Sequence, residues 1–280
     1  MTTISLASRL SEATLFALVM RHTGAIGRKQ AGIIEAAAET LPALMELFRI
    51  NTPARIEPFL AQTAHECDNF ATTEEYASGA AYDGRRDLGN TKDGDGRRFK
   101  GRAYIQLTGR ANYRAFTAWM RQHKADCPDF EAEPELVAQA PWAAWATVYF
   151  WSSRDLNALA DRGDFVGITR KINGGTNGLA DRRTKLAKAK LVVAKMQAEL
   201  VAEKQGIAPL RRGSEGSAVE RLQRALAAAG HYLLTIDGEF GPGTEGAVKT
   251  FQRSRGLIVD GIVGEQTLVA LEPFEQDQAA

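Results

Sequence analysis

Cysteine is scarce in this sequence, since 280 residues contain only two, Cys67 and Cys127. Two cysteines cannot build the disulfide framework that stabilises small secreted domains. We therefore expect two free thiols in a protein made in a reducing cytoplasm. No stretch approaches the roughly 18 consecutive apolar residues of a transmembrane helix, so we expect no stable membrane insertion. The polar start of the chain, residues 1–9, predicts that there is no signal peptide.

Motifs of metal and nucleophilic chemistry are missing or incomplete. His65-Glu66 begins the zinc motif H-E-x-x-H, but Asn69 stands where the second histidine is required. The best calcium-loop match has Thr91 and Arg102 at its first and twelfth positions, where acidic ligands belong. A Walker loop, a dinucleotide-binding glycine motif and a nucleophile elbow are all absent from the sequence. We therefore predict no metal and no other cofactor.

An excess of positive or negative charge is also lacking, because the formal net charge is only +1. This balance gives no reason to expect a nucleic acid as a partner. The residues before Pro209 are mildly basic and those after it mildly acidic. A mildly cationic N-terminal part suits an anionic polymer such as a bacterial wall, and it suits an ordinary enzyme equally well. The length, with 44% hydrophobic residues, fits two domains.

Two glutamates nine residues apart, Glu66 and Glu75, are the most informative feature present. Glu66 closes a helical pattern that starts near Arg55, and Glu75 follows a break at Asp68-Asn69. The helix has one apolar face with i, i+3, i+4 spacing, and Glu66 falls on its flank. That face consists of Ile56, Phe59, Leu60, Thr63, Ala64 and Cys67.

Two carboxyls on different local elements can divide the work of glycosidic bond cleavage, because one protonates the leaving oxygen and the other activates water. Partial burial should favour the protonated form of Glu66, whereas the polar stretch around Glu75 should leave that group ionised. The alternative is an exposed acid at a helix end followed by a solvated pair, Glu74-Glu75. The spacing alone does not decide between the two.

A polar and aromatic run bracketed by glycines, Gly101 to Tyr113, follows (G-R-A-Y-I-Q-L-T-G-R-A-N-Y). Gln106 and Asn112 offer donors and acceptors to sugar hydroxyl and N-acetyl groups, and Tyr104 and Tyr113 offer flat faces to sugar rings. The alternative is a buried strand-like segment with turn glycines. Later, I-N-G-G-T-N-G (172–178) predicts a tight turn, which would present its asparagine, residue 173, to a cleft.

Together, A-H-E, the second glutamate, G-R-x-x-I-Q-L-T-G-R-x-N-Y and I-N-G-G resemble the family 19 glycoside hydrolases, from Phe59 to Arg183. These chitinase and endolysin enzymes have a lysozyme-like helical fold. The resemblance implies that Glu66 is the general acid, Glu75 the general base and Thr108 a ligand of the nucleophilic water. Family members are inverting, so water would attack directly. The resemblance also implies substrate-binding residues, namely Gln106, Asn112, Tyr113, Asn173, and Arg182 or Arg183 near the acid.

This sequence departs from the family at two points. Glu74 directly precedes Glu75 and is therefore the alternative for the base. Cys67-Asp68-Asn69 replaces the small residues that usually follow the acid.

The sequence after Pro209 contains an internal repeat, D-G-x-[FV]-G-x-x-T, at Asp237–Thr244 and Asp260–Thr267. Each threonine is suited to cap a following helix, and short repeats of this kind must stack to form a core. With L-R-x-G-S-x-G-x-A-V-x-x-L-Q before it and A-V-x-x-F-Q after its first copy, the region 210–271 resembles the type 1 peptidoglycan-binding domain, a three-helix module. Candidate wall-binding residues are Asp237, Phe240, Thr244 and Gln252, although each could instead cap or pack.

The predicted fold class is mainly α, with a lysozyme-like catalytic domain and a small three-helix domain. The predicted boundaries are a catalytic domain at 1–204, a linker at 205–209, a peptidoglycan-binding domain at 210–273 and a tail at 274–280. Predicted helices of the first domain, besides the one that carries Glu66, are Leu6–Val19, Ala31–Leu47, Pro141–Trp151 as a core helix, and Asp181–Lys204. Those of the second are Ser217–Ala229, Thr244–Arg255 and Thr267–Leu271.

We expect an endolysin-type murein hydrolase that cleaves β-1,4 bonds between amino sugars. One alternative is a chitinase, although chitin lacks the stem peptides of a bacterial wall. The other is a non-catalytic wall-binding or toxin-like effector. We further expect a monomer that is made in the host bacterial cytoplasm and reaches the peptidoglycan through a holin lesion.

Overall fold

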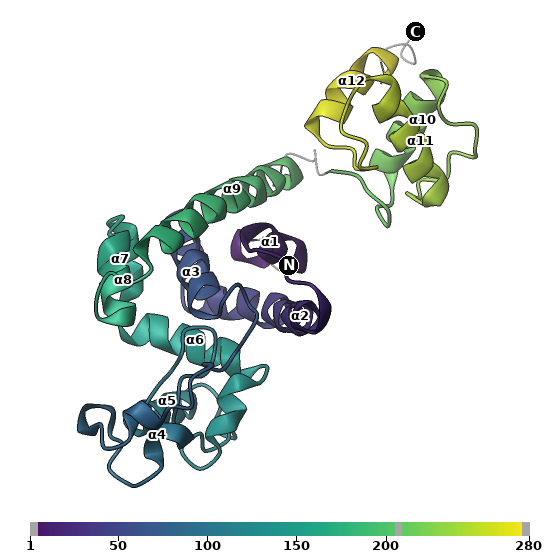
Figure 1. The fold of residues 1–280 in the computed structure, drawn as a ribbon. Coiled ribbons are helices and arrows are strands. Elements are labelled where there is room, and N and C mark those ends of the chain that lie inside the picture. The colour runs from purple at the N-terminus through teal and green to yellow at the C-terminus, as the bar shows by residue number, and fades with distance from the viewer. Residues whose placement is uncertain (1–4, 205–208, 276–280) are drawn as a thin grey trace. The chain divides into compact units, whose positions relative to one another are not determined.

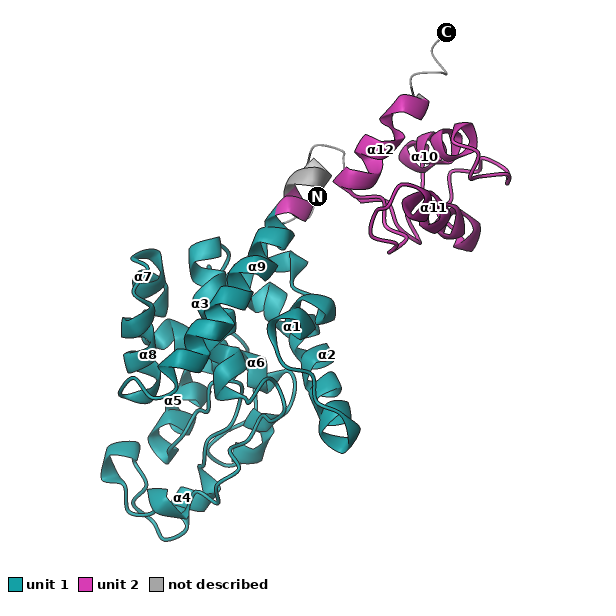
Figure 2. Ribbon diagram, turned by 45° about the horizontal axis from the view of Figure 1, so that its top comes forward, with its two compact units in different colours: residues 1–197 teal, residues 198–280 magenta. Residues whose placement is uncertain are grey.

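The computed structural model describes residues 5–204 and 209–275 and divides the chain into two compact units, 1–197 and 198–280 (Figure 2). Within the described ranges the chain forms helices and isolated β-bridges but no extended strand, so the predicted mainly α fold class is confirmed. Most of the predicted linker, 205–208, and the end of the predicted tail, 276–280, lie outside the described residues.

The first unit is a packing of helices joined by long connections (Figure 1). Its helices are α1 (Glu12–Leu18), α2 (Gly24–Leu47), α3 (Pro53–Glu66), α4 (Asp95–Arg98), α5 (Arg110–Met120), α6 (Trp142–Ser153), α7 (Leu156–Asp161), α8 (Phe165–Asn173) and α9 (Leu179–Lys204), which continues past residue 197. Short 3₁₀ turns are η1 (Ala7–Arg9), η2 (Ala80–Tyr82), η3 (Arg86–Leu88) and η4 (Pro134–Ala138).

The apolar helix α6 is the centre of this unit, because it contacts α2, α5 and α7. Eight of its side chains are buried, which confirms the predicted core helix. Phe59 of α3 packs edge-on against Trp151, with ring centroids 5.2 Å apart. The Thr147 hydroxyl accepts a hydrogen bond from the Tyr104 amide at 3.1 Å. Through these contacts α6 fixes both the helix that carries Glu66 and the segment that follows Gly101.

Several predicted boundaries are wrong. The first predicted helix is a 3₁₀ turn followed by the short α1, and α2 begins at Gly24, seven residues before its predicted start. In this earlier part of α2, Gln30 is buried and holds neighbouring segments together. Neither α5 nor α8 was predicted, and each overlaps a motif that we read as functional, at the start of α5 and at the end of α8.

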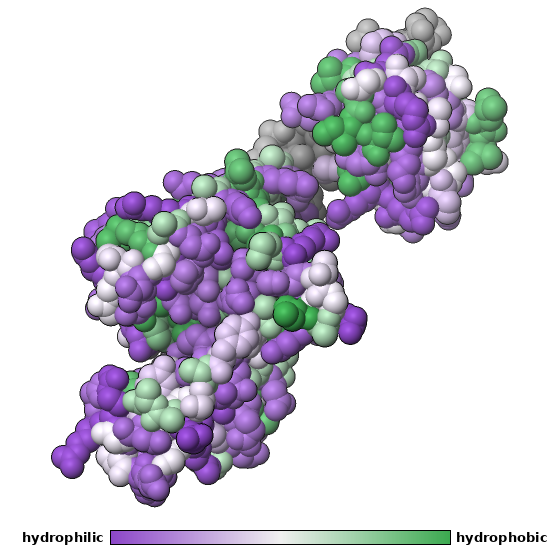
Figure 3. Space-filling view, viewed as in Figure 1, coloured by the Kyte–Doolittle hydropathy of each residue, from purple (hydrophilic) through white to green (hydrophobic). Residues whose placement is uncertain are grey.

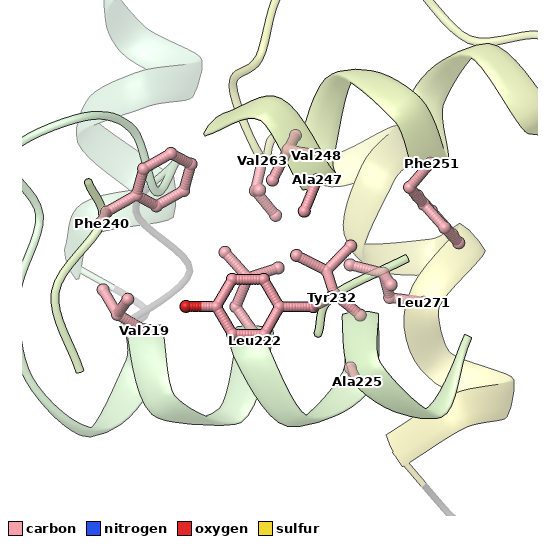
Figure 4. Packing of buried hydrophobic residues seen from close by; sticks show 11 residues of the cluster. Val219, Leu222, Ala225, Tyr232, Phe240, Ala247, Val248, Phe251, Val263 and Leu271 are labelled. Atoms are coloured by element: carbon pink, nitrogen blue, oxygen red, sulfur yellow. The ribbon is translucent and has the colours of Figure 1, made fainter. Parts of the chain in front are cut away.

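The second unit contains α10 (Ser217–Ala228), α11 (Pro242–Ser254) and α12 (Glu265–Glu275), which surround one hydrophobic core (Figure 4). The core residues come from all three helices and from the loops between them, and Phe240, Val248, Phe251 and Leu271 are fully or almost fully buried. These three helices match the predicted three-helix module, with α12 extending beyond its predicted end.

The internal repeat has a structural explanation in two buried glutamines. The Nε2 atom of Gln223 donates to Asp237 Oδ1 at 2.7 Å and to Thr244 Oγ1 at 3.2 Å. The Nε2 atom of Gln252 makes the same bonds in the second copy, to Asp260 at 2.8 Å and to Thr267 at 3.3 Å. Each repeat is therefore a loop closed by a buried glutamine. Buried amides need such internal partners, because unsatisfied polar groups are costly.

Candidate active site

The helix α3 positions Glu66 at its C-terminal end. Pro53 stands at the first helical position, where its fixed φ is favourable, and the apolar face of α3 is buried as predicted. Directly after the helix, Asp68, Asn69 and Phe70 have φ angles of 49°, 60° and 63°. Left-handed conformations cost non-glycine residues of order 1–3 kcal/mol each. The surrounding structure therefore enforces a sharp turn beside the acid.

Gln30 of α2 holds this turn through hydrogen bonds. Its Nε2 atom donates to the carbonyl of Asn69 at 2.7 Å and to the carbonyl of Met20 at 2.8 Å. The Asn69 amide donates back to the carbonyl of Ala64 at 2.8 Å. Phe70 is fully buried and contacts Tyr104 edge-on. These bonds and contacts offset the strain and fix the chain between the two glutamates.

A buried guanidinium faces Glu66. Arg182 Nη2 donates to Glu66 Oε1 at 2.5 Å, and the two side chains are 3% and 16% exposed. Arg182 also donates through Nη1 to Gln62 Oε1, and through Nε to the carbonyl of Asn177 at 3.2 Å. Gln62 in turn donates to Thr169 at 2.8 Å. The structure thus places Arg182 beside Glu66, while Arg183 is exposed.

The two side-chain oxygens of Glu66 have different surroundings. The carboxyl is mostly removed from solvent, as predicted. The guanidinium of Arg182 occupies Oε1 with a charge-assisted hydrogen bond. Because Arg182 bonds Oε1, the second oxygen, Oε2, is the one that can carry a proton toward the cleft.

Asn173 supports the loop that holds Arg182. Its Nδ2 atom donates to the carbonyl of Asn177 at 2.9 Å, the carbonyl that also accepts from Arg182. Its Oδ1 atom accepts from the amide of Gly175 at 2.9 Å. Both ends of this side chain are therefore used inside the predicted tight turn, so the structure gives Asn173 a structural role, and its sugar contact stays a prediction.

Glu75 is held by neutral donors. Its backbone amide donates to the carbonyl of Gly101 at 2.9 Å. Its side-chain Oε2 atom accepts from the Gly101 amide at 3.0 Å and from the Tyr82 hydroxyl at 3.2 Å. The other oxygen, Oε1, is buried and has no hydrogen-bond partner among the described residues. The Oε2 atom of Glu75 is therefore held by two hydrogen bonds, whereas no described residue holds Oε1.

Three predicted site residues converge on Gly101. A Cβ atom at this position would lie 2.6 Å from Gln106 Oε1, 2.7 Å from Glu75 Oε2 and 3.2 Å from Thr108 Oγ1. A side chain at residue 101 would displace the ends of Gln106 and Glu75, so glycine is what lets these groups approach the same point of the backbone. Gln106 Oε1 is a second buried acceptor without a partner in the described parts of the chain. Thr108 donates to the carbonyl of Gln106 at 2.9 Å.

Glu66, Glu75 and Gln106 line one cleft of about 430 Å³. The remaining lining residues are His65, Asp68, Asn69, Thr72, Tyr76, Asp181 and Lys185. Glu74 does not line it and instead pairs with Arg102 at 2.9 Å and with Lys100 at 3.4 Å. The placement of the two neighbouring glutamates favours Glu75 over Glu74 as the base.

The two tyrosines expected to stack on sugar rings are both in the core. Tyr104 and Tyr113 are at most 1% exposed, so neither ring offers a face to a ligand. The Tyr113 hydroxyl donates to the carbonyl of Lys100 at 2.7 Å and accepts from Arg102 at 3.1 Å. Asn112 is half-buried and donates to the carbonyl of Thr108 at 2.6 Å. The prediction for Tyr113 is therefore corrected to a packing role. Asn112 supports the backbone of Thr108 through its hydrogen bond.

Cleft residues that we did not predict come from both sides of Glu66. His65 Nδ1 lies 2.6 Å from Asp181 Oδ2, and the Nζ atom of Lys185 is 2.9 Å from the same oxygen. Tyr76 is 75% exposed and donates to Asp68 at 2.9 Å. His65 directly precedes Glu66, and Tyr76 directly follows Glu75. This adjacency to the two glutamates is the sequence signal that could have identified both residues.

The candidate wall-binding residues have internal roles in the second unit. Phe240, Thr244 and Gln252 are at most 2% exposed. Asp237 is exposed, but its Oδ1 atom accepts from Gln223 and from the Glu239 amide. Thr244 lies inside the first turn of α11 and does not cap it, because Gly241 is the N-cap. The predicted wall contacts of the buried Phe240, Thr244 and Gln252 are corrected to packing and loop closure, whereas the contact of the exposed Asp237 stays a prediction.

Apolar side chains on the surface of this unit are different residues. The most exposed are Leu233, Leu234, Ile258 and Val269. Figure 3 shows hydrophobic residues gathered on the visible face of the C-terminal unit, whereas hydrophilic residues predominate on the visible face of the first unit.

A search of the described ranges finds no group of three potential metal ligands. In the same residues, no helix is both long enough and apolar enough to cross a membrane.

Comparison with known proteins identifies each part of the chain separately. Residues 215–271 match the peptidoglycan binding domain family. A glycosyl hydrolase family 19 domain-containing protein of Haemophilus influenzae is 35% identical over 119 residues, which cover 42% of this chain and 54% of that protein. A zinc D-Ala-D-Ala carboxypeptidase of Streptomyces albus G is 42% identical over 72 residues, covering 24% of this chain and 28% of that enzyme.

The chain thus spans about half the length of the first relative and little more than a quarter of the second. Among solved structures, chitinase C from Streptomyces griseus superimposes with a TM-score of 0.51 at 19% identity, over 69% of this chain and 96% of that one. At this identity the likeness establishes the fold. The chain therefore joins a helical domain similar to the family 19 glycoside hydrolases to a C-terminal peptidoglycan-binding domain.

Proposed function

We propose that this protein is a glycoside hydrolase that cleaves β-1,4 bonds between the amino sugars of bacterial peptidoglycan. One observation carries the proposal: Glu66 and Glu75 line the same cleft but have different partners, a buried arginine and a pair of neutral donors. The peptidoglycan-binding domain supports a wall polymer as the substrate.

The proposed reaction is a single displacement by water. Glu66 transfers a proton from Oε2 to the glycosidic oxygen as the bond from that oxygen to the anomeric carbon breaks. Glu75 takes a proton through Oε1 from a water molecule, whose oxygen attacks the opposite face of the same carbon. Glu66 leaves the step as a carboxylate that Arg182 stabilises, and Glu75 leaves it protonated. Proton exchange with solvent restores both groups.

Two side chains complete the water site in this proposal. Gln106 Oε1 is a buried acceptor without a partner in the described chain, and it lies near Glu75 around Gly101. Thr108 Oγ1 approaches the same point. Both can accept a hydrogen bond from water. This arrangement orients the water toward the anomeric carbon while Glu75 removes its proton.

The C-terminal domain would hold the enzyme on its polymer. Tethering raises the effective concentration of the cleft at the wall without changing the chemistry. A fragment of residues 1–204 should therefore cleave short soluble oligosaccharides normally and sediment poorly with purified murein. Equal sedimentation of the fragment and the full chain would remove the targeting role. We also propose an endolysin role for a monomer, supported by the pairing of a lytic and a wall-binding part.

The second candidate is a chitinase, favoured by the structural likeness to chitinase C. Parallel assays on purified murein and on chitin oligomers, followed by mass analysis of the products, separate the two. Proton NMR of fresh products tests the mechanism, because direct water attack on a β-linked substrate gives the α-anomer first. A β-anomer as first product would overturn the single displacement, and wild-type protein inactive on both substrates would overturn the proposal.

A further inference from the structure

The base is supported asymmetrically. The two donors to the Glu75 carboxylate, the Gly101 backbone amide and the Tyr82 hydroxyl, both bond Oε2, whereas Oε1 has no partner among the described residues. Of these two donors only Tyr82 is a side chain, and it comes from a segment, Gly79–Gly101, that the proposed mechanism leaves without a role. In sequence this segment predicts only a long loop rich in glycine, aspartate and arginine.

The segment is built around the backbone of Tyr82. Asn90 is fully buried, donates to the carbonyl of Tyr82 at 2.9 Å and accepts from the amide of Arg110 at 2.9 Å. Gly96 packs so closely that a Cβ atom there would lie 2.5 Å from the carbonyl oxygen of Gly79 and 2.7 Å from the carbonyl carbon of Tyr82. The turn that presents the Tyr82 side chain is therefore fixed from two sides.

Ion pairs anchor this segment to α5. Arg110 pairs with the buried Asp95 and, at 3.0 Å, with Glu131. Hydrogen bonds from Arg110 hold the pKa of Asp95 at about 2, and bonds from Arg114 and Arg110 hold the pKa of Glu131 at about 2. Both carboxylates stay charged down to about that pH. The anchor therefore does not titrate in the range of roughly pH 4 to 9 where a glycosidase would be assayed.

We propose that Tyr82 is a positioning residue for the base: its hydroxyl holds Glu75 Oε2 so that the ionised carboxylate directs Oε1 at the attacking water. This inference rests on the proposed function. The rigid Gly79–Gly101 segment then acts as the support for that hydroxyl.

The chemistry of the phenol fits this role. Burial, together with the neighbouring Glu75 carboxylate, raises the pKa of Tyr82 above its ordinary value, so the group remains a donor at neutral pH. A donor to the charged form of a carboxyl stabilises that form. The Tyr82 hydroxyl is therefore suited to hold the carboxylate of Glu75 in place.

Other charged groups also face this site. Lys100 donates to the carbonyl of Glu75 at 3.3 Å and pairs with Glu74, and Arg85 acts on Tyr82 electrostatically. The cleft itself contributes Glu66, His65, Asp68, Tyr76, Asp181 and Lys185. All of these groups are present in both the wild type and a Tyr82 variant, so their titration cancels when two profiles are compared.

The test is the pH profile of Tyr82→Phe on a soluble oligosaccharide. Loss of the hydroxyl should move the acid limb of kcat/KM to higher pH, because the carboxylate loses a donor and is protonated more readily. On that limb we expect a loss of roughly tenfold, the size expected for one hydrogen bond to a charged group. KM should change little. The matched control is Tyr76→Phe, whose hydroxyl donates to Asp68 instead and whose profile should keep its acid limb in place.

A double-mutant comparison separates this role from a structural one. In a Glu75→Gln background the Tyr82→Phe change should have less than a twofold further effect, because the group that it positions is gone. Full additivity, an unmoved acid limb, or a raised KM alone would overturn the inference while Glu75→Gln remains inactive. Retained activity in Glu75→Gln by itself would instead overturn the assigned base, and the role of Tyr82 with it.

Discussion

The two carboxylates of the cleft are supported in opposite ways. Glu66 ends a helix and faces a buried cation, Arg182, which in turn is held by Gln62 and a backbone carbonyl. Glu75 lies in a loop and is bonded by an amide and a phenol, both neutral. The cation suits a group that must end the bond-breaking step with a negative charge. Neutral donors orient a carboxylate while leaving it able to accept a proton.

The difference shows that the partner of each carboxyl, rather than its place in the sequence motif, indicates its role. Both groups are drawn into the same cleft and both are partly removed from water. Desolvation alone would act on the two in the same direction. The asymmetry comes from elements distant in sequence, α9 for the acid and the 79–101 segment for the base.

The largest effect is expected from Glu66→Gln. An amide cannot protonate the leaving oxygen, and losing a general acid costs roughly 10² to 10⁴ in rate. The amide can still accept a hydrogen bond from Arg182, so the fold should survive, as a thermal melt would show. Near wild-type clearing of a murein suspension by the folded variant would place the acid elsewhere.

An activated substrate should separate the two glutamates. A nitrophenyl glycoside has a leaving group that needs little protonation, so it should restore much of the activity of Glu66→Gln. It should not restore Glu75→Gln, because water still requires a base. We expect the two variants to differ by at least about tenfold on this substrate, measured by release of the phenol. Equal recovery of both variants would contradict the assigned division of roles.

A smaller effect is expected from Asn173→Ala. The side chain supports the carbonyl of Asn177 that accepts from Arg182, and one neutral hydrogen bond contributes about 1 kcal/mol. That corresponds to roughly a fivefold fall in kcat with little change in KM. The control is Asn177→Ala, which keeps the backbone carbonyl. If Asn173→Ala raised KM and left kcat intact, the residue would be a sugar contact, as the family resemblance first suggested.

The sequence predicted the parts of this site that depend on local pattern. The apolar periodicity of α3 predicted the helix and the position of Glu66 at its end. The motif from Gly101 to Thr108 contains Gln106 and Thr108, whose side chains lie near Glu75 around Gly101, and the internal repeat predicted the compact second unit. The family resemblance and the mainly α fold were both confirmed.

Other features depend on long-range contacts that no local pattern encodes. Three consecutive left-handed residues after Cys67 are held in part by Gln30, some forty positions away, which bonds the carbonyl of Asn69. Tyr113 looked like a ligand platform, since an aromatic residue in a polar run suits either a surface or a core. Its burial follows from its place on α5, a helix that begins within the motif. Thr244 and Gln252 looked like binding residues for the same reason, because polar side chains that close a buried loop resemble exposed ones in sequence.

The smallest effect is expected from Glu74→Gln. This variant tests whether the base is Glu75 or the glutamate directly before it. Glu74 is 41% exposed and pairs with Arg102 and Lys100. Ion pairs with an exposed partner contribute about 0.2–1 kcal/mol, and the contribution lies toward the upper end here because the Arg102 side chain is only 8% exposed. Arg102 keeps its bonds to Arg98 and Tyr113 when the pair is lost. We therefore expect a slightly lower melting temperature and less than about a threefold change in kcat. The matched variant is Glu75→Gln, which removes a carboxyl one residue away and should be almost inactive. An inactive Glu74→Gln beside an active Glu75→Gln would move the base by one residue and transfer its support from Tyr82 to Arg102, a cation, so that acid and base would no longer differ in the charge of their partners.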